Sequence, residues 1–373
     1  MNIPSRMTAD CVRLPLQATT PGILAAKVPG LSLGEARKIV SAVHRLDRLP
    51  GSVNMVRRTS LDAVRAAGFL PALRVLSVQP SRIDPFVKYA LATPDGCIIE
   101  AVRIPLERSG RYSVCVSSQA GCGLGCAFCA TGHAGMLRNL ETWEILEQVR
   151  AIRRGLDRTR RQRVHGIVFQ GMGEPLANVD RVIQAIHVLC EPSALAIDGR
   201  AITLCTAGIP SGIRRLAAEC PKVRLAVSIG SARPEIRRLL MPVDRVHPLE
   251  EVIAAAADYT LRTRLAPMWA VTLLAGVNDT EADARALARL ARFFLERTGI
   301  RPQLRLIPYN PIDVPGREPF LRSDDQRETA FWRVLREEGF GIRKRYSGGA
   351  DIRAACGQLA GRYPPDVQQT CGS

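Results

Sequence analysis

Three cysteines lie within eight residues of one segment, Cys122-Gly-Leu-Gly-Cys126-Ala-Phe-Cys129, and we expect no fourth cysteine or histidine at ligand spacing close behind them. A structural zinc ion is normally held by four protein ligands. An iron–sulfur cluster, in contrast, can be held by three thiolates, which leaves one iron able to bind another molecule. The spacing therefore favours a reactive iron–sulfur cluster over a structural zinc site.

The chain has 373 residues, of which 46% are apolar and 23% are charged, as in an ordinary globular protein. The N-terminus lacks the features of a secretion signal, and no apolar run approaches the ~18 residues of a membrane-spanning helix. Eleven cysteines in so long a chain are too few for a disulfide scaffold, so we expect reduced thiols and metal ligation. These features predict a cytoplasmic protein with no membrane partner.

Basic residues outnumber acidic ones by 52 to 35, which gives a net charge of +17. Almost all of this charge is arginine, whose planar guanidinium binds phosphate oxygens in pairs. The excess favours a nucleic-acid partner, although a genome rich in arginine codons would give the same balance. One basic run could hold an RNA backbone or be only a solvated helix end. It consists of Arg153, Arg154, Arg158, Arg160, Arg161 and Arg163.

Residues 111–345 alternate between apolar, β-rich runs and helical patterns. Strands are predicted at 113–116, 166–169, 202–204, 223–227, 270–274 and 304–307, and helices at 141–154, 178–190, 210–219, 248–261, 281–297 and 324–338. Strands that are apolar along their length and alternate with helices indicate a parallel sheet covered by helices. We predict an α/β protein with a partial (β/α)6-type barrel. Such barrels carry their chemistry at the C-terminal ends of the strands. The cysteine segment follows the first strand, so its position agrees with a chemical role.

Two helices are predicted before the barrel, in an accessory module at residues 1–78. Ser32 and Glu35 form a capping-box pattern ahead of one amphipathic helix. A second short helix is predicted from Ser60 to Ala67, with Gly68 behind it. The module is basic, so we interpret it as an RNA-docking piece, although its charges could also be a solvated face.

A β-hairpin extension is predicted at residues 79–110, with strands at 86–92 and 97–104 around the turn Pro94-Asp95-Gly96. The period of two places Glu100 on the same face as apolar residues of the second strand. Burial would favour the neutral form of this carboxyl group and suit it to proton transfer. An edge strand with Glu100 at a wet rim would fit the pattern equally well.

The tail at 346–373 has a different character. It begins as a loop, and residues 352–359 could form one short helix that carries Cys356. Cys371, close to the C-terminus, has no pattern around it and looks incidental.

A C-x3-C-x2-C segment after the first strand of an α/β barrel resembles the radical S-adenosylmethionine (SAM) superfamily, and Phe128 fits the aromatic residue usual before the last cysteine. The resemblance implies one [4Fe–4S] cluster on Cys122, Cys126 and Cys129. It also implies that the open iron chelates S-adenosylmethionine and that an electron from the cluster releases a 5′-deoxyadenosyl radical. A one-electron reductant such as flavodoxin or ferredoxin would then be a partner.

Five further motifs narrow the resemblance to the RlmN/Cfr family of radical SAM RNA adenosine methyltransferases, over about residues 86 to 361. They are Val114-Cys115-Val-Ser-Ser-Gln-Ala-Gly-Cys122, Arg138-Asn139-Leu140, Gly171-Met-Gly-Glu-Pro175, Ile307-Pro-Tyr-Asn310-Pro311 and Asp351-Ile-Arg-Ala-Ala-Cys356-Gly-Gln-Leu359.

The resemblance implies a role for two further cysteines. Cys356 would accept a methyl group, which a radical then attaches to the adenine ring as a protein–RNA crosslink, and Cys115 would resolve the crosslink by forming a disulfide with Cys356. The alternative for each is a buried structural cysteine. By the same resemblance, Glu100 is the proton acceptor.

The resemblance also implies cofactor contacts, and two of the segments depart from the family. Gly173 and Glu174 would bind the methionine amino group, and Asn310 would contact the cofactor.

Where the family has Leu-Ser-Thr-Ser-Gly, this chain has Leu204-Cys205-Thr-Ala-Gly208. Where it has Ser-Leu-His-Ala, this chain has Ser228-Ile229-Gly230-Ser231, without the histidine. Glu235, Arg237 and Pro242 match, while Asp244 stands where the family has asparagine. We expect the cofactor to bind through altered ribose or adenine contacts, which Cys205, Ser228, Ile229 and Gly230 would provide.

The implied activity is methylation of an adenine carbon, C2, in 23S rRNA and also in tRNA, by a monomer. Methylation at C8 is the alternative within the family. A different radical SAM enzyme would not need Cys356, and an RNA-binding protein with a structural zinc loop would lack the brown colour of a cluster.

Overall fold

The computed structural model describes residues 13–157, 159–314 and 320–360. Arg158 of the basic run and Cys371 of the tail lie outside the described residues. The chain divides into two compact units, one of residues 1–72 and 187–196, and one of residues 73–186 and 197–373. No helix in the described part of the chain is both long and apolar enough to cross a membrane.

The first unit is a small helical bundle. It contains β1 (Leu14–Pro15), α1 (Pro21–Lys27), α2 (Leu33–Leu46), α3 (Arg58–Ala67) and β2 (Gly68–Phe69). The capping box is confirmed: Glu35 N donates to Ser32 Oγ, and Ser32 N donates to Glu35 Oε2. The apolar faces of α2 and α3 meet in a core around Ile39, Val43 and Val64, so the helical periodicity of this part is also confirmed.

The second unit is built on one ten-stranded sheet with the order β14-β13-β12-β11-β10-β9-β6-β5-β4-β3. Its strands are β3 (Arg74–Pro80), β4 (Val87–Ala92), β5 (Ile98–Pro105), β6 (Arg111–Val116), β9 (Arg163–Phe169), β10 (Ile202–Thr206), β11 (Arg224–Ser228), β12 (Met268–Leu273), β13 (Gln303–Pro308) and β14 (Ile342–Lys344). The strands from β6 to β14 are parallel, and β3 to β5 form an antiparallel meander that joins them at β6. A partial α/β barrel with a hairpin extension is therefore confirmed.

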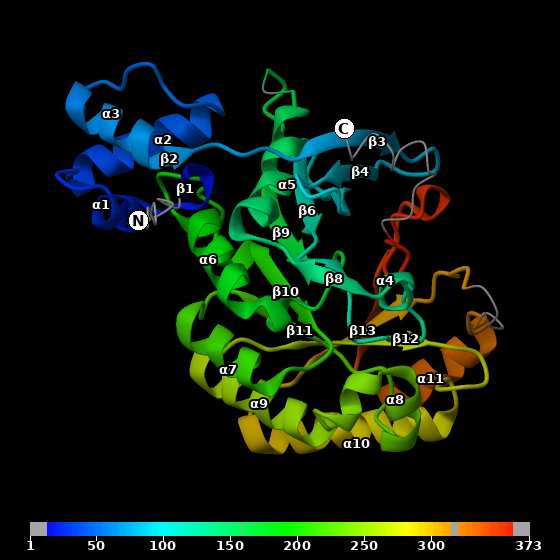
Figure 1. Cartoon of the computed structure of the whole chain (residues 1–373). Helices are drawn as coiled ribbons and strands as arrows, with labels where there is room; N and C mark the ends of the chain where they lie inside the picture. The colour runs from blue at the N-terminus through cyan, green and yellow to red at the C-terminus, as the bar shows by residue number, and fades with distance from the viewer. Residues whose placement is uncertain (1–12, 158, 315–319, 361–373) are drawn as a thin grey trace, which may run out of the picture. The chain divides into compact units, whose positions relative to one another are not determined.

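Helices alternate with the parallel strands. They are α5 (Thr142–Arg154), α6 (Val179–Cys190), α7 (Pro210–Glu219), α8 (Pro234–Leu240), α9 (Leu249–Thr263), α10 (Glu281–Thr298) and α11 (Asp325–Glu337). Figure 1 shows α9, α10 and α11 following one another along one side of the sheet. The core lies between these helices and the strands, where Trp269 of β12 packs edge to face on Phe294 of α10 at 5.2 Å. This core fixes the strand ends that face the site.

The expected helix at residues 352–359 was wrong. Only a single 3-10 turn forms, at Ala350–Ile352. Arg353 and Gly357 have positive φ values of 52° and 84°, which are incompatible with a continuing right-handed helix. The backbone of this segment instead bonds to the rest of the second unit, as described below.

Candidate active site

The three-cysteine segment is held at its base by a small two-stranded ribbon, β7 (Gln119–Gly121) with β8 (Met136–Asn139), and is followed by α4 (Ala130–Ala134). Cys122 N donates to Gly135 O at 2.8 Å. Gly121 has a φ of +82°, and a Cβ there would lie 2.0 Å from the Gly135 oxygen. Only glycine fits this close approach, so the ribbon can close beneath the loop.

The thiols of Cys122, Cys126 and Cys129 line one cavity of about 240 Å³. Burial raises the pKa of the Cys122 thiol to about 11 and that of Cys126 further. No three His, Cys, Asp or Glu side chains of the described residues converge on a single ion position. Three thiols around one cavity match the ligand set of a cluster that leaves one iron open.

The expectation that no histidine follows the three cysteines at ligand spacing was wrong, because His133 lies four residues after Cys129. Its Nε2 lies 2.9 Å from the carbonyl oxygen of Ala127, to which it is hydrogen-bonded. The imidazole therefore helps to hold the loop through this bond.

Most of the residues expected at the site line the same cavity. They are Cys115, Cys122, Cys126, Cys129, Gly173, Glu174, Cys205, Ser228, Gly230, Asn310 and Cys356. Two expected residues do not line it. Ile229 is fully buried and borders a separate small pocket, and Glu100 lies beside the cavity, behind the C-terminal tail.

The tail that carries Cys356 is fastened from two sides. Asn310, just after β13, donates its Nδ2 to the backbone oxygen of Cys356 at 3.1 Å and to Ser347 Oγ at 2.9 Å. On the other side, Ala130 N at the start of α4 donates to Gly357 O at 2.7 Å, and Thr131 Oγ1 donates to Leu359 O. These bonds replace those of the expected helix and hold Cys356 beside the cluster loop.

Cys115 lies on β6, with Val102 of β5 and Val168 of β9 as its register partners. Burial raises the pKa of its thiol, and the nearby Cys356 and Cys205 thiols raise it further. The guanidinium of Arg345 acts in the opposite direction on Cys115 and Cys205. Neither Cys115 nor Cys356 is in a disulfide, so both are reduced thiols in this structure.

Glu100 is buried, with 4% of its side chain exposed, and does not stand at a wet rim. Its Oε1 lies 3.1 Å from Nζ of Lys88, and its Oε2 accepts a hydrogen bond from Ala360 N at 2.9 Å. The carboxylate is therefore paired on one side and held by the tail on the other.

Gly173 and Glu174 follow β9 at the C-terminal end of the sheet. Gly173 has a φ of +97°, and a Cβ there would lie 2.5 Å from the side chain of Gln119. Glu174 is buried, which raises its pKa, and its carboxylate accepts hydrogen bonds from Leu176 N and Ala207 N. These bonds fix the carboxylate at the cavity wall.

Gly230 has a structural reason to be glycine. Its φ is +67°, and a Cβ would lie 2.6 Å from Sδ of Met241. A histidine at this position would be strained and would need Met241 to move, so the missing family histidine is consistent with the local packing.

A further departure, Asp244, takes part in a buried network around Arg237, whose side chain has no exposed area. The guanidinium pairs with Asp244 Oδ1 at 2.9 Å and donates to the carbonyl oxygens of Ala207, Ser228 and Ile229. Arg237 thus ties together the ends of β10 and β11, where the cofactor-side residues lie.

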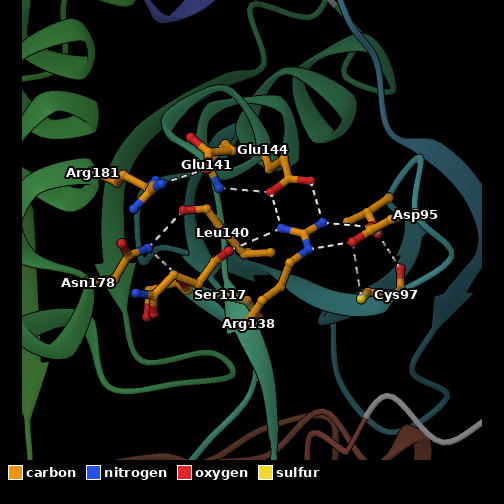
Figure 2. A network of polar contacts seen from close by, with 12 residues as sticks. Asp95, Cys97, Ser117, Arg138, Leu140, Glu141, Glu144, Asn178 and Arg181 are labelled. Atoms are coloured by element: carbon orange, nitrogen blue, oxygen red, sulfur yellow. Dashed lines mark hydrogen bonds and ion pairs between the residues drawn. The ribbon is translucent and has the colours of Figure 1, made fainter.

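The Arg138-Asn139-Leu140 motif is architectural in this structure. Figure 2 shows the guanidinium of Arg138 between Glu144, at the start of α5, and Asp95, in the hairpin turn. The nitrogens of Arg138 lie 2.6–2.8 Å from oxygens of both carboxylates. Asn178 adds a bond from its Nδ2 to Leu140 O at 2.8 Å. The motif therefore fastens the hairpin to the base of the cluster loop.

The described part of the basic run is partly neutralised. Arg154 pairs with Glu147 at 2.7 Å, and Arg160 pairs with Asp157 at 3.3 Å. An RNA-binding role for the run therefore stays a prediction.

Two charged residues next to the site were not found from the sequence. Arg345 lines the cavity, where it donates to Gln170 Oε1 at 2.8 Å, and no local pattern marks it among so many arginines. Lys88 has a usable signal, because the hairpin turn sets the strand register and places Lys88 diagonal to Glu100.

Comparisons with known proteins agree with this geometry. A model of the Radical SAM superfamily matches residues 116–291. The chain is 58% identical over 349 residues to "Probable RNA methyltransferase sce3898" of Sorangium cellulosum, which covers 89% of this chain and 88% of the relative. It is also 44% identical over 295 residues to "Dual-specificity RNA methyltransferase RlmN" of Syntrophobacter fumaroxidans. This match covers 79% of this chain and 82% of the relative.

A solved structure is similar over nearly the whole chain. The crystal structure of a radical SAM methyltransferase from Sphaerobacter thermophilus matches with a TM-score of 0.81 and 33% sequence identity. The match covers 94% of this chain and all of that one.

Proposed function

From the premise that this chain belongs to the RlmN/Cfr family of radical SAM RNA methyltransferases, we propose that it methylates C2 of an adenine in RNA. The proposed targets are 23S rRNA and tRNA. A relative named as a dual-specificity RNA methyltransferase supports the choice of two kinds of RNA.

The residues around the cavity fit the cofactors that membership of the radical SAM family implies, a [4Fe–4S] cluster and S-adenosylmethionine. Cys122, Cys126 and Cys129 would hold the cluster. Gly173, Glu174 and Asn310 would contact S-adenosylmethionine, together with Cys205, Ser228 and Gly230. When bound and reduced by a partner such as flavodoxin or ferredoxin, these cofactors supply a methyl group and the radical that activates it. Ile229 is not expected to contact S-adenosylmethionine, because its side chain is buried away from the cavity.

Two thiols and one carboxylate carry the proposed chemistry of the chain itself. Cys356 loses its thiol proton and takes the methyl group on its sulfur. After the activated methyl carbon has bonded to the adenine ring, the adduct gives up its unpaired electron, which the cluster would accept, and Glu100 accepts the proton that leaves the substituted ring carbon. The Cys115 thiolate then attacks the Cys356 sulfur, which forms a disulfide and breaks the bond from sulfur to the methyl carbon. That carbon keeps the bonding pair and takes up a proton to become the methyl group of the product.

The observation that carries the proposal is the joint position of Cys115 and Cys356. They lie far apart in the sequence, yet both line the cavity of the cluster loop. A radical SAM enzyme that did not use a protein-bound methyl group would have no need of this arrangement, whose tail is held by bonds to both α4 and Asn310.

Nucleoside mass spectrometry tests the proposal. The purified protein is reconstituted anaerobically with iron and sulfide and incubated with S-adenosylmethionine, a reductant, and 23S rRNA fragments or tRNA. We expect 2-methyladenosine, and none with Cys356→Ala. Formation of 8-methyladenosine would show the other regiochemistry of the family, and no methyladenosine in any RNA would contradict the proposal.

A further inference from the structure

Lys88 is a buried cation that the proposed reaction does not yet use. Only 9% of its side chain is exposed, and its Nζ lies 3.1 Å from Oε1 of Glu100. A charge this deeply buried is costly unless it is paired, and the Glu100 carboxylate provides such a pairing.

The strand register explains how the two side chains meet. β4 and β5 are antiparallel, with Lys88 opposite Val102 and Ala90 opposite Glu100. Lys88 and Glu100 are therefore diagonal neighbours on one face of the sheet, at a distance that a long side chain can span. Phe86 and Val102 lie on the same face and line the cavity, so the pair lies next to the cavity wall.

The two carboxylate oxygens of Glu100 have different partners. Oε1 faces Lys88 within the hairpin, whereas Oε2 accepts the N–H of Ala360, four residues after Cys356 in the tail. The two oxygens therefore face different parts of the second unit, Oε1 the hairpin and Oε2 the tail.

A stability role alone gives little reason for this pair. Replacing a buried ion pair by apolar residues of similar volume is often neutral or stabilising, while removing one partner is costly. The neighbouring positions on this face are apolar, and an apolar pair would continue them. What the lysine adds is a fixed positive charge beside one oxygen of the carboxylate.

We propose that Lys88 is a positioning residue that holds Oε1 of Glu100 so that Oε2 is aimed to accept the proton of the substituted adenine carbon. The inference rests on the proposed function. In this step, after the adduct has given up its unpaired electron to the oxidised cluster, the ring C–H bond breaks, its proton goes to Oε2, and its electron pair stays in the ring. Lys88 holds Oε1 throughout and does not touch the substrate.

The test separates early from late steps of the reaction. Lys88→Met, Glu100→Gln and the double variant are compared with wild type as reconstituted enzymes. Methylation of Cys356 and release of 5′-deoxyadenosine report the steps before the base reacts. The protein–RNA adduct, seen on a denaturing gel, and methyladenosine report the later ones. Thermal unfolding is measured on each protein without RNA.

Lys344→Met is the matched control, since Lys344 also pairs with a glutamate, Glu328, on α11. It removes a more exposed lysine–carboxylate contact away from Glu100, and we expect product formation within twofold of wild type.

For Lys88→Met we expect normal Cys356 methylation and 5′-deoxyadenosine release, an accumulating adduct, and at least tenfold less methyladenosine. The double variant should be no slower than Glu100→Gln, because residues that act as a unit have non-additive effects, and it should unfold at a higher temperature than Lys88→Met.

Methyladenosine formation within twofold of wild type in Lys88→Met would overturn the inference, as would a parallel loss of 5′-deoxyadenosine, which would indicate a structural role. If wild type forms no methyladenosine, the proposed function itself fails. If wild type and Lys88→Met are both active, only the role of Lys88 fails.

Discussion

The side-chain nitrogen Nδ2 of Asn310 lies 3.1 Å from the backbone oxygen of Cys356 and 2.9 Å from Ser347 Oγ. One amide at the end of β13 thus holds both the tail that carries Cys356 and the loop that leads into it. This links the position of the Cys356 thiol to the rigid barrel rather than to the tail itself.

Asn310→Ala should therefore slow methylation of Cys356. Two hydrogen bonds of about 0.5–1.5 kcal/mol each are lost, and about 1.4 kcal/mol corresponds to a tenfold change. We expect about a tenfold lower rate of methyl transfer to Cys356, measured by intact mass, with cofactor affinity measured separately. Gln358→Ala is the control, because it removes an exposed tail bond to Pro311 O. Unchanged methylation in Asn310→Ala would contradict this role.

Restoring the family histidine should destabilise the protein. In Gly230→His the side chain meets Met241 and the backbone keeps a positive φ, so we expect a loss of about 1–3 kcal/mol in the free energy of unfolding. Gly341→Ala is the control, since no atom lies within 4 Å of a Cβ there and no positive φ is required. Equal stability of Gly230→His and wild type would show that the backbone adapts at this position.

The Arg237 network allows a comparison of two ways of disturbing it. Arg237→Met leaves Asp244 buried without its main cation, and we expect a loss of about 3–5 kcal/mol in unfolding free energy together with lower bound iron after reconstitution. Asp244→Asn keeps a hydrogen-bonding side chain and should cost less. The exposed pair of Arg214 with Asp258 is the control, where Arg214→Met should cost under about 1 kcal/mol. A similar small cost in Arg237→Met would refute the importance of the network.

Local sequence patterns were sufficient to predict those strands and helices whose apolar face packs on the core. The strands and helices of the barrel follow from apolar runs and helical spacing, because each element buries one face against the next. The tail was different: residues 352–359 have helical composition, but Gly357 O bonds to α4 and Cys356 O to Asn310. Such partners are distant in sequence, so no local pattern contains them.

Some residues of the candidate site could also be found from local spacing, whereas others could not. Cys122, Cys126 and Cys129 are adjacent and could be found by spacing, whereas Cys115 and Cys356 were identified only through a family resemblance. The departure at Gly230 could be noticed but not explained, because its reason is a backbone angle and the sulfur of Met241. Both belong to tertiary structure rather than to sequence order.

Asp95 gives a prediction for the dependence of stability on pH. Hydrogen bonds from Arg138 hold the pKa of Asp95 well below its ordinary value of 3.8. A depressed folded-state pKa adds stability that is present above the unfolded pKa and lost as the pH falls through the folded one. The unfolding free energy of wild type minus that of Asp95→Asn should therefore be constant above about pH 5 and decrease below about pH 4. A difference that does not change between these values, or that grows as the pH falls, would contradict the ion pair.

The central claim is that Cys356 carries the transferred carbon and Cys115 releases it. The most direct measurement is mass spectrometry of the Cys356 peptide after turnover of Cys115→Ala with RNA. Cys220→Ala, a buried thiol that does not line the cavity, is the control and should turn over normally. We expect Cys115→Ala to accumulate RNA covalently bound through the methylene group on Cys356 and to release no methyladenosine. Methyladenosine released at the wild-type rate, with no RNA on Cys356, would contradict the account.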